Sequence, residues 1–365
     1  MKIQLSHSFE DIISLENLLF AWQEFIRGKK KRRDVQAFSL NLMDNILQLR
    51  HDLKSLTYKH GGYQAFKIND PKPRDIHKAS VRDRLLHHAI YRVLYPFFDK
   101  TFIADSYSCR LDKGTHKAIN RFRAFAYQAS KNNTRTCWIL KGDIRKFFAN
   151  IDHDILLSIL REYIPDKNII NLLAEVIGSF FSGKIGVGLP LSNLTSQLLV
   201  NIYLNKFDQF VKHKLKAKYY LRYADDFVIF AENKQWLEAQ IFTIQEFLRN
   251  ELKLELHPDK VFIKTFSAGV DFLGIVNFTN HRILRTKTKR RMFKKLQRKK
   301  RELDNGLMTP ESFKQSLQSY LGTLTHCNGY KLKQQLLMKF SWKIFENKVR
   351  YQLQISYKQT DSSSR

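Results

Sequence analysis

The sequence predicts an α+β fold in which short strands that end in carboxylates are mixed with longer helices. Residues 137–143 and 219–231 have the aromatic and β-branched composition of strands. Longer segments with apolar residues at helical spacing lie before and after them. Lysine and arginine number 63 against 34 acidic residues, a formal net charge of +29, and this excess indicates a polyanionic partner.

The whole chain of 365 residues is long enough for one large domain or for roughly two or three smaller units. Nucleic acid is the leading candidate for the partner, and an anionic membrane is the alternative. The chain has no apolar stretch of membrane-spanning length and does not begin with a secretory signal. Its cysteines are too scattered for a zinc site or a disulfide framework. We therefore expect a cytoplasmic protein with no membrane partner.

The N-terminal third predicts helices around one β-loop. Residues 1–60 have helical character, with a basic break at residues 29–33. Residues 61–80 combine Gly, Pro and basic residues, which favours a β-loop over a helix. Helical periodicity then resumes and lasts until Pro96, and residues 106–128 predict a glycine-bearing turn followed by a basic amphipathic helix.

Asp143 ends an apolar run and is followed by a turn and a helix. The apolar residues after position 152 recur at helical spacing, so a strand gives way to a turn and then to a helix at this point. Asp152 lies at the start of that helix. It is therefore predicted to cap the helix rather than to bind a metal.

The adjacent pair Asp225–Asp226 lies between two apolar runs and is predicted to form the tip of a tight hairpin. Because side chains alternate along a strand, one carboxylate should bind a metal while the other lies more peripherally. Solvated turn residues are the simpler interpretation, since Asp is common in turns. Asp143 favours the metal site, because two strand-end carboxylates that meet in one sheet could hold two magnesium ions about 3.5–4 Å apart.

The segments that follow continue the mixed pattern. Residues 183–204 predict a glycine-rich turn that leads into an apolar helix. Residues 252–266 predict a helix end, a turn and a strand. Residues 269–278 predict a hairpin.

Residues 285–301 contain eleven basic residues and no acid. Met292, Phe293 and Leu296 are spaced to form a buried stripe while the cations cover the rest of a helix. A solvated helix face is the simpler interpretation. Because no nearby acid balances so many cations, contact with phosphates is the preferred one.

Several motifs occur in an order that resembles the palm of reverse transcriptases. They are the strand that ends at Asp143, then GLPLSNLTSQ, YADD, HPDK and FLG, and the resemblance covers about residues 60–280. The chain is similar to the bacterial group II intron-like enzymes. Within these it most resembles the diversity-generating retroelement type, through DPKPRDIHKASVRDRLLHHAI, DSYSCRLDKGTHKAI and SYLGTLTHCNGYKL. Defence-associated bacterial reverse transcriptases share several of these blocks.

The resemblance implies a right-hand polymerase with fingers, a palm and a helical thumb. The palm would be an antiparallel sheet with helices. Residues 1–60 would form an N-terminal helical extension and residues 61–285 the fingers and palm. Residues 286–352 would form the basic thumb, followed by a C-terminal tail over residues 353–365.

The resemblance also implies which residues are catalytic. Asp143, Asp225 and Asp226 would form the catalytic triad. Two Mg²⁺ ions would be bound by Asp143 and Asp225 with help from the Ile144 carbonyl oxygen. The primer 3′-oxygen would then attack the α-phosphorus of the incoming nucleotide.

Other residues match positions that bind the nucleotide or the nucleic acid. Phe148 would screen the sugar 2′-hydroxyl and so favour deoxynucleotides. Lys72 and Arg74 would hold the triphosphate, and Lys260 would lie near the leaving phosphates. The residues implied to contact nucleic acid are Phe272, Leu273 and Gly274 of the primer grip and the thumb cations Lys289, Arg290, Lys294, Lys295, Arg298 and Lys299.

Leu191 and Ser192 depart from the Gln-Gly that many reverse transcriptases carry after the Leu-Pro of this block. Diversity-generating enzymes also have an aliphatic residue at the position of Leu191, and low fidelity opposite template adenine is associated with it. The resemblance therefore places Leu191 among the nucleotide-binding residues. Ser192 departs even from the glycine that is usual in that group.

These features predict an RNA-directed DNA polymerase that uses a template RNA, an RNA or DNA primer and deoxynucleoside triphosphates. No residues remain after the thumb for a nuclease or a maturase DNA-binding domain, so we expect a small accessory protein or a structured non-coding RNA as partner. A phage-defence enzyme with a dedicated non-coding RNA is the first alternative. A non-catalytic RNA-binding scaffold is the second, and the three retained acids argue against it.

Overall fold

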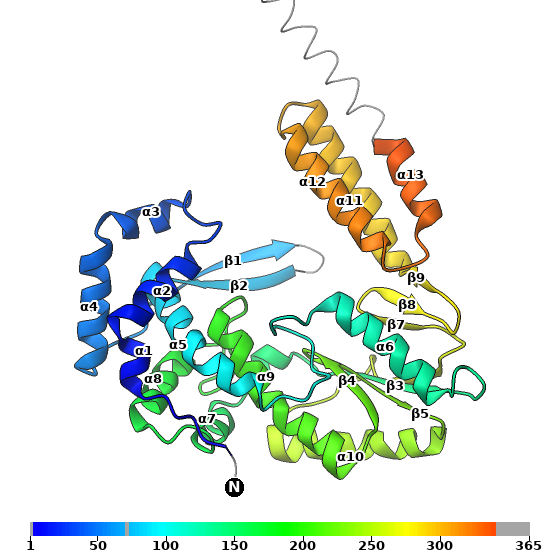
Figure 1. Ribbon diagram of the computed structural model, residues 1–365, viewed down its shortest axis with the longest axis horizontal. Coiled ribbons are helices and arrows are strands. Elements are labelled where there is room, and N and C mark those ends of the chain that lie inside the picture. Colours follow the sequence, from blue (N-terminus) through cyan, green and yellow to red (C-terminus); the bar gives the residue numbers. More distant parts are fainter. Residues whose placement is uncertain (1–2, 70–72, 341–365) are drawn as a thin grey trace, which may run out of the picture. The chain divides into compact units, whose positions relative to one another are not determined.

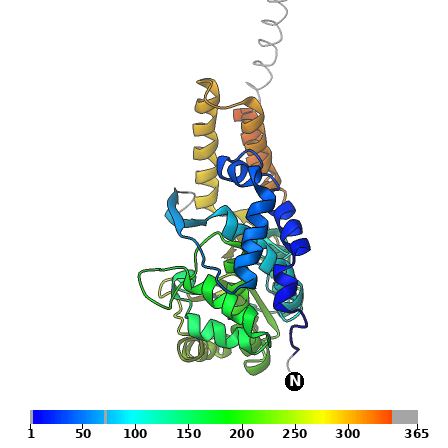
Figure 2. The ribbon, with the colours of Figure 1, turned by 90° about the vertical axis from the view of Figure 1, so that its left-hand side faces the viewer.

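The computed structural model describes residues 3–69 and 73–340 (Figures 1 and 2). The chain divides into two compact units. Residues 1–125 and 138–263 belong to the first, here the large unit, and residues 126–137 and 264–365 to the second, here the small unit.

Helices form the N-terminal part of the large unit, as the sequence predicts, because hydroxyl side chains cap helices whose apolar faces are buried. Ser14 accepts a hydrogen bond from the Asn17 backbone N–H, and Ser80 accepts one from that of Asp83. In Figure 2 the first four of these helices carry the blue colours of the first part of the chain, and the fifth, at residues 81–99, is cyan. They are α1 Phe9–Ile13, α2 Leu15–Phe25, α3 Arg33–Leu40, α4 Leu42–Lys54 and α5 Val81–Asp99.

Helix α5 does not stop at Pro96, where the sequence predicted its end, but continues to Asp99. Proline lacks a backbone N–H and therefore removes one hydrogen bond of the helix. The last turn is held by packing instead, because Leu94, Tyr95 and Phe98 are buried in the core of the large unit. Tertiary burial thus outweighs the local effect of the proline.

An antiparallel hairpin occupies the position of the predicted β-loop. Strand β1, Tyr63–Asn69, pairs with β2, Pro73–Ala79, with Tyr63 opposite Ala79. Nearly all side chains of β1 are exposed. The hairpin therefore presents most of its surface to solvent.

The central sheet of the large unit brings the predicted carboxylates to one end. Its strands have the order β4-β5-β3-β6. Strand β5 is antiparallel to both β3 and β4, and Asp143 lies opposite Asp226 in the register. The strands are β3 Trp138–Asp143, β4 Tyr219–Tyr223, β5 Asp226–Ala231 and β6 Phe262–Thr265.

Helices cover both faces of this sheet, because its strands are apolar on both sides. Phe227 contacts Phe207 of α9 with ring centroids 5.2 Å apart, whereas Phe230 contacts Phe122 of α6 at 4.9 Å. Side chains three positions apart on a strand point to opposite faces, so α6 and α9 cover different faces. These helices are α6 Thr115–Ala129, α7 His153–Arg161, α8 Lys167–Gly178, α9 Leu194–Gln209 and α10 Lys234–Leu252. The predicted cap is confirmed, since the Asp152 side chain accepts a hydrogen bond from the Ile155 N–H at 3.0 Å.

The small unit combines a three-stranded antiparallel sheet with helices (Figure 1). The predicted hairpin is present, and a third short strand, which the sequence did not predict, pairs with its second strand. The predicted buried stripe is confirmed at Met292 and Leu296, while Phe293 is half-buried. The elements are β7 Val270–Phe272, β8 Ile275–Asn277, β9 Arg282–Leu284, α11 Thr286–Asp304, α12 Pro310–Leu324 and α13 Tyr330–Phe340.

The described part of the chain contains no helix that is both long and apolar enough to cross a membrane. Cys109, Cys137 and Cys327 are free thiols. The end of the predicted thumb and the predicted tail, residues 353–365, lie outside the described residues.

Candidate active site

Asp143 and Asp225 lie at the same end of the central sheet. Asp143 is the last residue of β3, and Asp225 lies in the turn before β5. The Ile144 backbone N–H donates a hydrogen bond of 3.2 Å to the Asp225 carbonyl oxygen, which extends the β3–β5 pairing one step past Asp143. The two strand ends therefore bring these carboxylates together, as the sequence predicted.

The Asp225 carboxyl lies where its negative charge is disfavoured. Burial, followed by the negative charges of Asp226 and Asp143, raises the pKa of Asp225 to about 6. The positive charge of Lys260 acts in the opposite direction. A bound cation would relieve this accumulation of like charges.

Asp226 has a partner of its own. Its carboxylate lies 3.7 Å from the Lys141 ammonium group on the neighbouring strand β3. Sequence reasoning did not single out Lys141. The ion pair agrees with the expectation that one carboxylate of the Asp225–Asp226 pair is more peripheral, and the catalytic role of Asp226 stays a prediction.

Lys260 reaches the site from the turn that precedes β6. Its ammonium group lies 2.8 Å from Asp143 Oδ1, and the His257 backbone N–H donates a 2.7 Å hydrogen bond to the Asp143 carbonyl oxygen. A lysine in this position balances the carboxylate charge while no cation is bound. The Lys260 side chain is 42% exposed, so its ammonium group is accessible from solvent.

The oxygen donors at this end of the sheet suit magnesium that is held partly by a substrate. Within residues 3–69 and 73–340, no three or more His, Cys, Asp or Glu side chains are grouped so that they could hold a metal alone. Asp143 and Asp225 supply carboxylate oxygens, and the Ile144 carbonyl oxygen as a further ligand stays a prediction. Magnesium prefers oxygen ligands and commonly completes its shell with water and substrate phosphates. Two carboxylates and a carbonyl therefore fit this ion.

Phe148 and Leu191 belong to one connected stretch of backbone. Phe148 lies in the short 3₁₀ turn Phe147–Asn150, and its carbonyl oxygen accepts a 2.8 Å hydrogen bond from the Leu189 N–H. This bond ties the GLPLS segment, which carries Leu191, to the turn that carries Phe148. Both side chains are half-buried, and their contact with a nucleotide stays a prediction.

Ser192 has a backbone conformation that glycine adopts more readily. Its φ is +82°, in the left-handed region where a side chain causes strain. The position is the one at which the resembled pattern carries glycine. The turn is therefore kept with a serine, at a cost of about 1 kcal/mol.

The structure describes one of the two predicted fingers cations. Arg74 lies on β2 opposite Ile68 of β1, and its side chain is exposed. Lys72 lies outside the described residues. Their contact with the triphosphate stays a prediction.

The FLG motif forms the turn of the β7–β8 hairpin in the small unit. Leu273 and Gly274 have φ values of +52° and +86°, the combination that suits a two-residue hairpin. A leucine rarely adopts this conformation, and strain of this kind often occurs at functional sites. The Gly274 carbonyl accepts a 3.0 Å hydrogen bond from the Arg285 N–H, which connects the turn with the start of α11. The role of Phe272, Leu273 and Gly274 as a primer grip stays a prediction.

Helix α11 carries cations where a helix does not favour them. Its first turn contains no acid, and basic residues lie close to the N-terminus, where the helix dipole is already positive. Arg290, Lys294 and Arg298 are exposed and follow each other at four-residue spacing on one face. Lys299 differs, because its ammonium group donates to Ser316 of α12. The contact of these cations with nucleic acid stays a prediction.

Sequence reasoning missed a buried ion pair beside the turn that carries Asp225. Arg222 of β4 and Asp208 of α9 are both 0% exposed, and their charged groups are 2.7 Å apart. The sequence does contain an indication of such a pair, because an arginine inside the apolar strand YYLRY requires a buried acid as partner. The sequence alone could not say which acid this would be.

Comparison with known proteins points in the same direction. A family model described as "Reverse transcriptase (RNA-dependent DNA polymerase)" matches residues 67–277, more than half of the chain. Protein YkfC of Escherichia coli (strain K12) is 28% identical over 261 residues, which cover 60% of this chain and 65% of that protein. The group II intron-encoded protein LtrA of Lactococcus lactis subsp. cremoris is 25% identical over 278 residues, 57% of this chain and 45% of that protein.

A more distant relative is the putative COX1/OXI3 intron 2 protein of Saccharomyces cerevisiae. It is 22% identical over 276 residues, which cover 59% of this chain and 30% of that protein. The chain thus spans less than two thirds of the length of each of these relatives.

Proposed function

The chain belongs to the reverse transcriptase (RNA-dependent DNA polymerase) family, and we propose that it copies an RNA template into DNA at the Asp143–Asp225 site. One observation carries the proposal. The two strand-end carboxylates meet, with Lys260 beside them, inside the segment that the family model matches. Such pairs of carboxylates serve two-metal displacement at phosphorus.

Asp143 and Asp225 would hold two magnesium ions together with the Ile144 carbonyl oxygen. When bound, these ions supply the positive charge that activates the primer 3′-hydroxyl and neutralises the triphosphate. The protein's own contribution is to hold both carboxylates in fixed positions, because phosphoryl transfer depends mainly on positioning and charge. The Lys260 ammonium group would leave Asp143 and bind the phosphates of the leaving group.

The remaining predicted residues would select and hold the substrates. Phe148 would fill the space of a ribose 2′-hydroxyl, while Lys72 and Arg74 would hold the triphosphate. In the small unit, the FLG turn would contact the primer. The exposed cations of α11 would follow the template–primer backbone.

Primer extension on an RNA template tests the proposal. Purified wild type should extend a DNA primer with deoxynucleotides and Mg²⁺. Asp143→Asn and Asp225→Asn should each slow extension about 100-fold or more while leaving RNA binding intact, because a metal-binding charge is lost. Asp259→Asn, an exposed acid in the turn that carries Lys260, is the matched control and should extend normally. Extension by both variants at the wild-type rate would refute the site. A wild type that binds RNA without extending the primer would point to a scaffold.

For the biological role, we propose error-prone synthesis in a diversity-generating retroelement. The motif resemblance and the aliphatic Leu191 support this role over a phage-defence enzyme with a dedicated non-coding RNA. Neighbouring DNA separates the two, since template and variable repeats accompany the first and a lone operon with a structured RNA the second. In either case we expect the protein to act in the cytoplasm with a small accessory protein or a structured RNA.

A further inference from the structure

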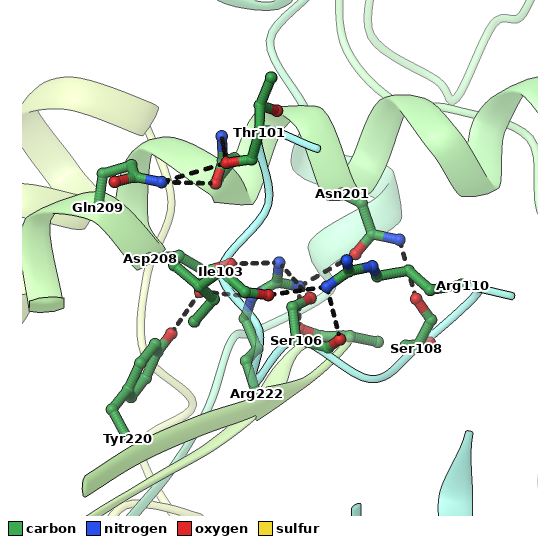
Figure 3. A network of polar contacts seen from close by, with 12 residues as sticks. Thr101, Ile103, Ser106, Ser108, Arg110, Asn201, Asp208, Gln209, Tyr220 and Arg222 are labelled. Carbon is green, nitrogen blue, oxygen red and sulfur yellow. Dashed lines mark hydrogen bonds and ion pairs between the residues drawn. The ribbon is translucent and has the colours of Figure 1, made fainter. Parts of the chain in front are cut away.

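Arg222 lies at the centre of a buried polar network beside the turn that carries Asp225 (Figure 3). It belongs to β4, where the neighbouring Tyr220 and Leu221 are fully buried as well. A guanidinium group that is buried among apolar residues is stable only when its charge and its N–H groups find partners.

Each N–H group of the Arg222 guanidinium has an acceptor (Figure 3). Nε and Nη2 donate to the two carboxylate oxygens of Asp208 at 2.8 and 2.7 Å. Nη2 also donates to Ser106 Oγ at 3.1 Å. Nη1 donates to Asn201 Oδ1 at 3.3 Å and to the Ala224 carbonyl oxygen at 3.1 Å. Because the fork on Asp208 fixes the guanidinium plane, the bond to Ala224 has a fixed direction.

Asp208 is itself held in place. The Tyr220 hydroxyl donates a 2.6 Å hydrogen bond to Asp208 Oδ1. Asp208 belongs to α9, a helix that is buried on nearly all sides. The network therefore connects the catalytic turn to one of the most rigidly packed elements of the large unit.

Ala224 has a backbone conformation that needs support. Its φ is +54°, in the left-handed region that residues other than glycine adopt only at a cost. It directly precedes Asp225, so rotation of the Ala224 backbone would displace the Asp225 carboxylate. The peptide after Asp225 is held separately, by the bond from the Ile144 N–H to the Asp225 carbonyl.

We propose that Arg222 is a positioning residue for nucleotide addition, which holds the Ala224 carbonyl and thereby fixes the turn that presents Asp225. Arg222 acts through Ala224, and its contacts are the protein groups of this network. The catalytic consequence rests on the proposed function. The hold on the turn is a property of the fold and is measurable without catalysis.

Arg222→Lys tests the catalytic consequence. Lysine keeps the positive charge but lacks the planar fork that binds Asp208 and Ala224 together. The maximal rate of single-nucleotide incorporation should fall about 10- to 100-fold, because small displacements of reacting groups have effects of this size. The concentrations of nucleotide and template–primer that give half-maximal rate should change less than about threefold.

Amide hydrogen exchange at Ile144 provides the readout that does not depend on activity. Its N–H is bonded to the Asp225 carbonyl, so a loosened turn should expose it more often. In Arg222→Lys the peptide that contains Ile144 should exchange about tenfold faster. A peptide from the buried helix α5 should exchange as in the wild type.

Arg84→Lys is the matched control. The Arg84 side chain is 14% exposed and pairs with Asp34 at 2.6 Å. It also donates to the backbone carbonyl of Ser80, and neither partner contacts Arg222. This variant should lose a comparable amount of thermal stability, while its incorporation rate and its exchange at Ile144 remain those of the wild type.

Equal rates and equal Ile144 exchange in Arg222→Lys and Arg84→Lys would overturn the proposal. If Arg222→Lys does not fold, the double variant Arg222→Gln with Asp208→Asn carries the same expectations, because it removes both buried charges at once. A further outcome is faster exchange at Ile144 in Arg222→Lys while the wild type adds no nucleotide. That result would support the hold of Arg222 on the turn and refute the proposed function.

Discussion

At the scale of single residues, three carboxylates at one end of the central sheet repel one another and so lower the stability of the folded protein. Asp143, Asp225 and Asp226 accumulate negative charge at one place, and Asp225 is affected most. Lys260 and Lys141 each neutralise one of the other two carboxylates. Asp225 is therefore the acid whose charge the folded protein tolerates least, and the one for which a bound cation matters most.

Asp225→Asn should stabilise the protein in the absence of divalent cations. With a pKa near 6 in the folded state against 3.8 in the unfolded chain, the folded protein binds more protons between these values. Its stability therefore falls as the pH rises through this range and stays lower above pH 6. Asparagine cannot ionise, so the variant should gain about 1–2 kcal/mol at pH 7.5, discounted for partial exposure.

Thermal unfolding in chelator at pH 7.5 and pH 4 measures this difference. The gain should shrink at pH 4, where Asp225 is protonated, and it should shrink again when Mg²⁺ is added at pH 7.5. Asp259→Asn, an exposed acid, should show neither effect. A stability difference that is the same at both pH values would contradict the origin of the shift.

Leu191→Gln should reduce misincorporation opposite template adenine. The physical reason is that leucine cannot hydrogen-bond near the nascent base pair, so discrimination there depends on shape alone. Error rates from deep sequencing of cDNA measure the change. Ile185→Gln, at a side chain that is 88% exposed, introduces the same amide as a control. An error spectrum that Leu191→Gln leaves unaltered would remove this residue from the fidelity site.

At the scale of elements, close contact between β3 and β5 aligns the two carboxylate-bearing strand ends. Gly142 directly precedes Asp143, and Phe227 directly follows Asp226 and lies opposite Gly142 in the register. A Cβ atom at position 142 would lie 2.2 Å from the Phe227 ring. Only glycine leaves room for the ring at this point.

Gly142→Ala should therefore lower the free energy of unfolding by about 1–3 kcal/mol, the usual cost of overpacking a core. The same displacement of β3 against β5 should slow primer extension. Thermal unfolding and extension rates are the measurements. Phe227→Leu in the Gly142→Ala background should restore part of the stability and part of the extension rate, because it removes the ring that the added Cβ atom would meet.

Gly178→Ala is the control for this prediction. Gly178 lies in α8, where an added Cβ has nothing within 4 Å. A neutral or slightly stabilising effect is expected there. If Gly142→Ala is equally harmless, then the contact with Phe227 does not constrain the register.

The second element-scale prediction concerns α11. Replacement of Arg290, Lys294 and Arg298 by Gln should weaken binding to all RNA sequences alike. Each lost phosphate contact should lower the slope of log affinity against log salt by roughly 0.7–0.9. Filter binding or fluorescence anisotropy at several salt concentrations measures the slope.

The basic break in the N-terminal helices offers a matched control with the same number of exposed cations, Lys30, Lys31 and Arg33. Their replacement by Gln changes the net charge equally. A comparable decrease of the salt-dependence slope in both variants would mean that overall charge, rather than the face of α11, determines binding. An unchanged slope in the α11 variant would make this helix a solvated face.

At the scale of the whole molecule, an extensive apolar core holds the large unit together. The core of the large unit consists of apolar side chains from the N-terminal helices, the sheet and the helices that cover it. The candidate metal ligands lie at one end of the sheet. Burial of apolar surface, rather than metal binding, therefore supplies most of the stability.

Removal of Mg²⁺ should abolish extension and leave the fold intact. Treatment with EDTA should change the far-UV circular dichroism little and the melting temperature by only a few degrees, and added Mg²⁺ should restore extension. Loss of secondary structure in EDTA would show instead that the ions are structural. A protein that extends primers equally well in EDTA would contradict the two-metal site.

The sequence by itself determined the local structure and the position of the chemistry along the chain. Apolar periodicity, Gly and Pro positions and the strand-end acids predicted the main helices, the hairpins and the approach of Asp143 to Asp225. The helices and hairpins depend on interactions between near neighbours, which the sequence displays directly, whereas the approach of the two acids was inferred from their positions at strand ends. The order of the motifs then indicated the enzyme family.

Only the tertiary structure decided which distant side chains become partners. It pairs Lys260 with Asp143 and Arg222 with Asp208, it extends α5 past Pro96, and it places Ser192 at a positive φ. Each of these outcomes depends on contacts between segments far apart in the chain. Such contacts form only when the folded chain brings these segments together, so local sequence patterns do not reveal them.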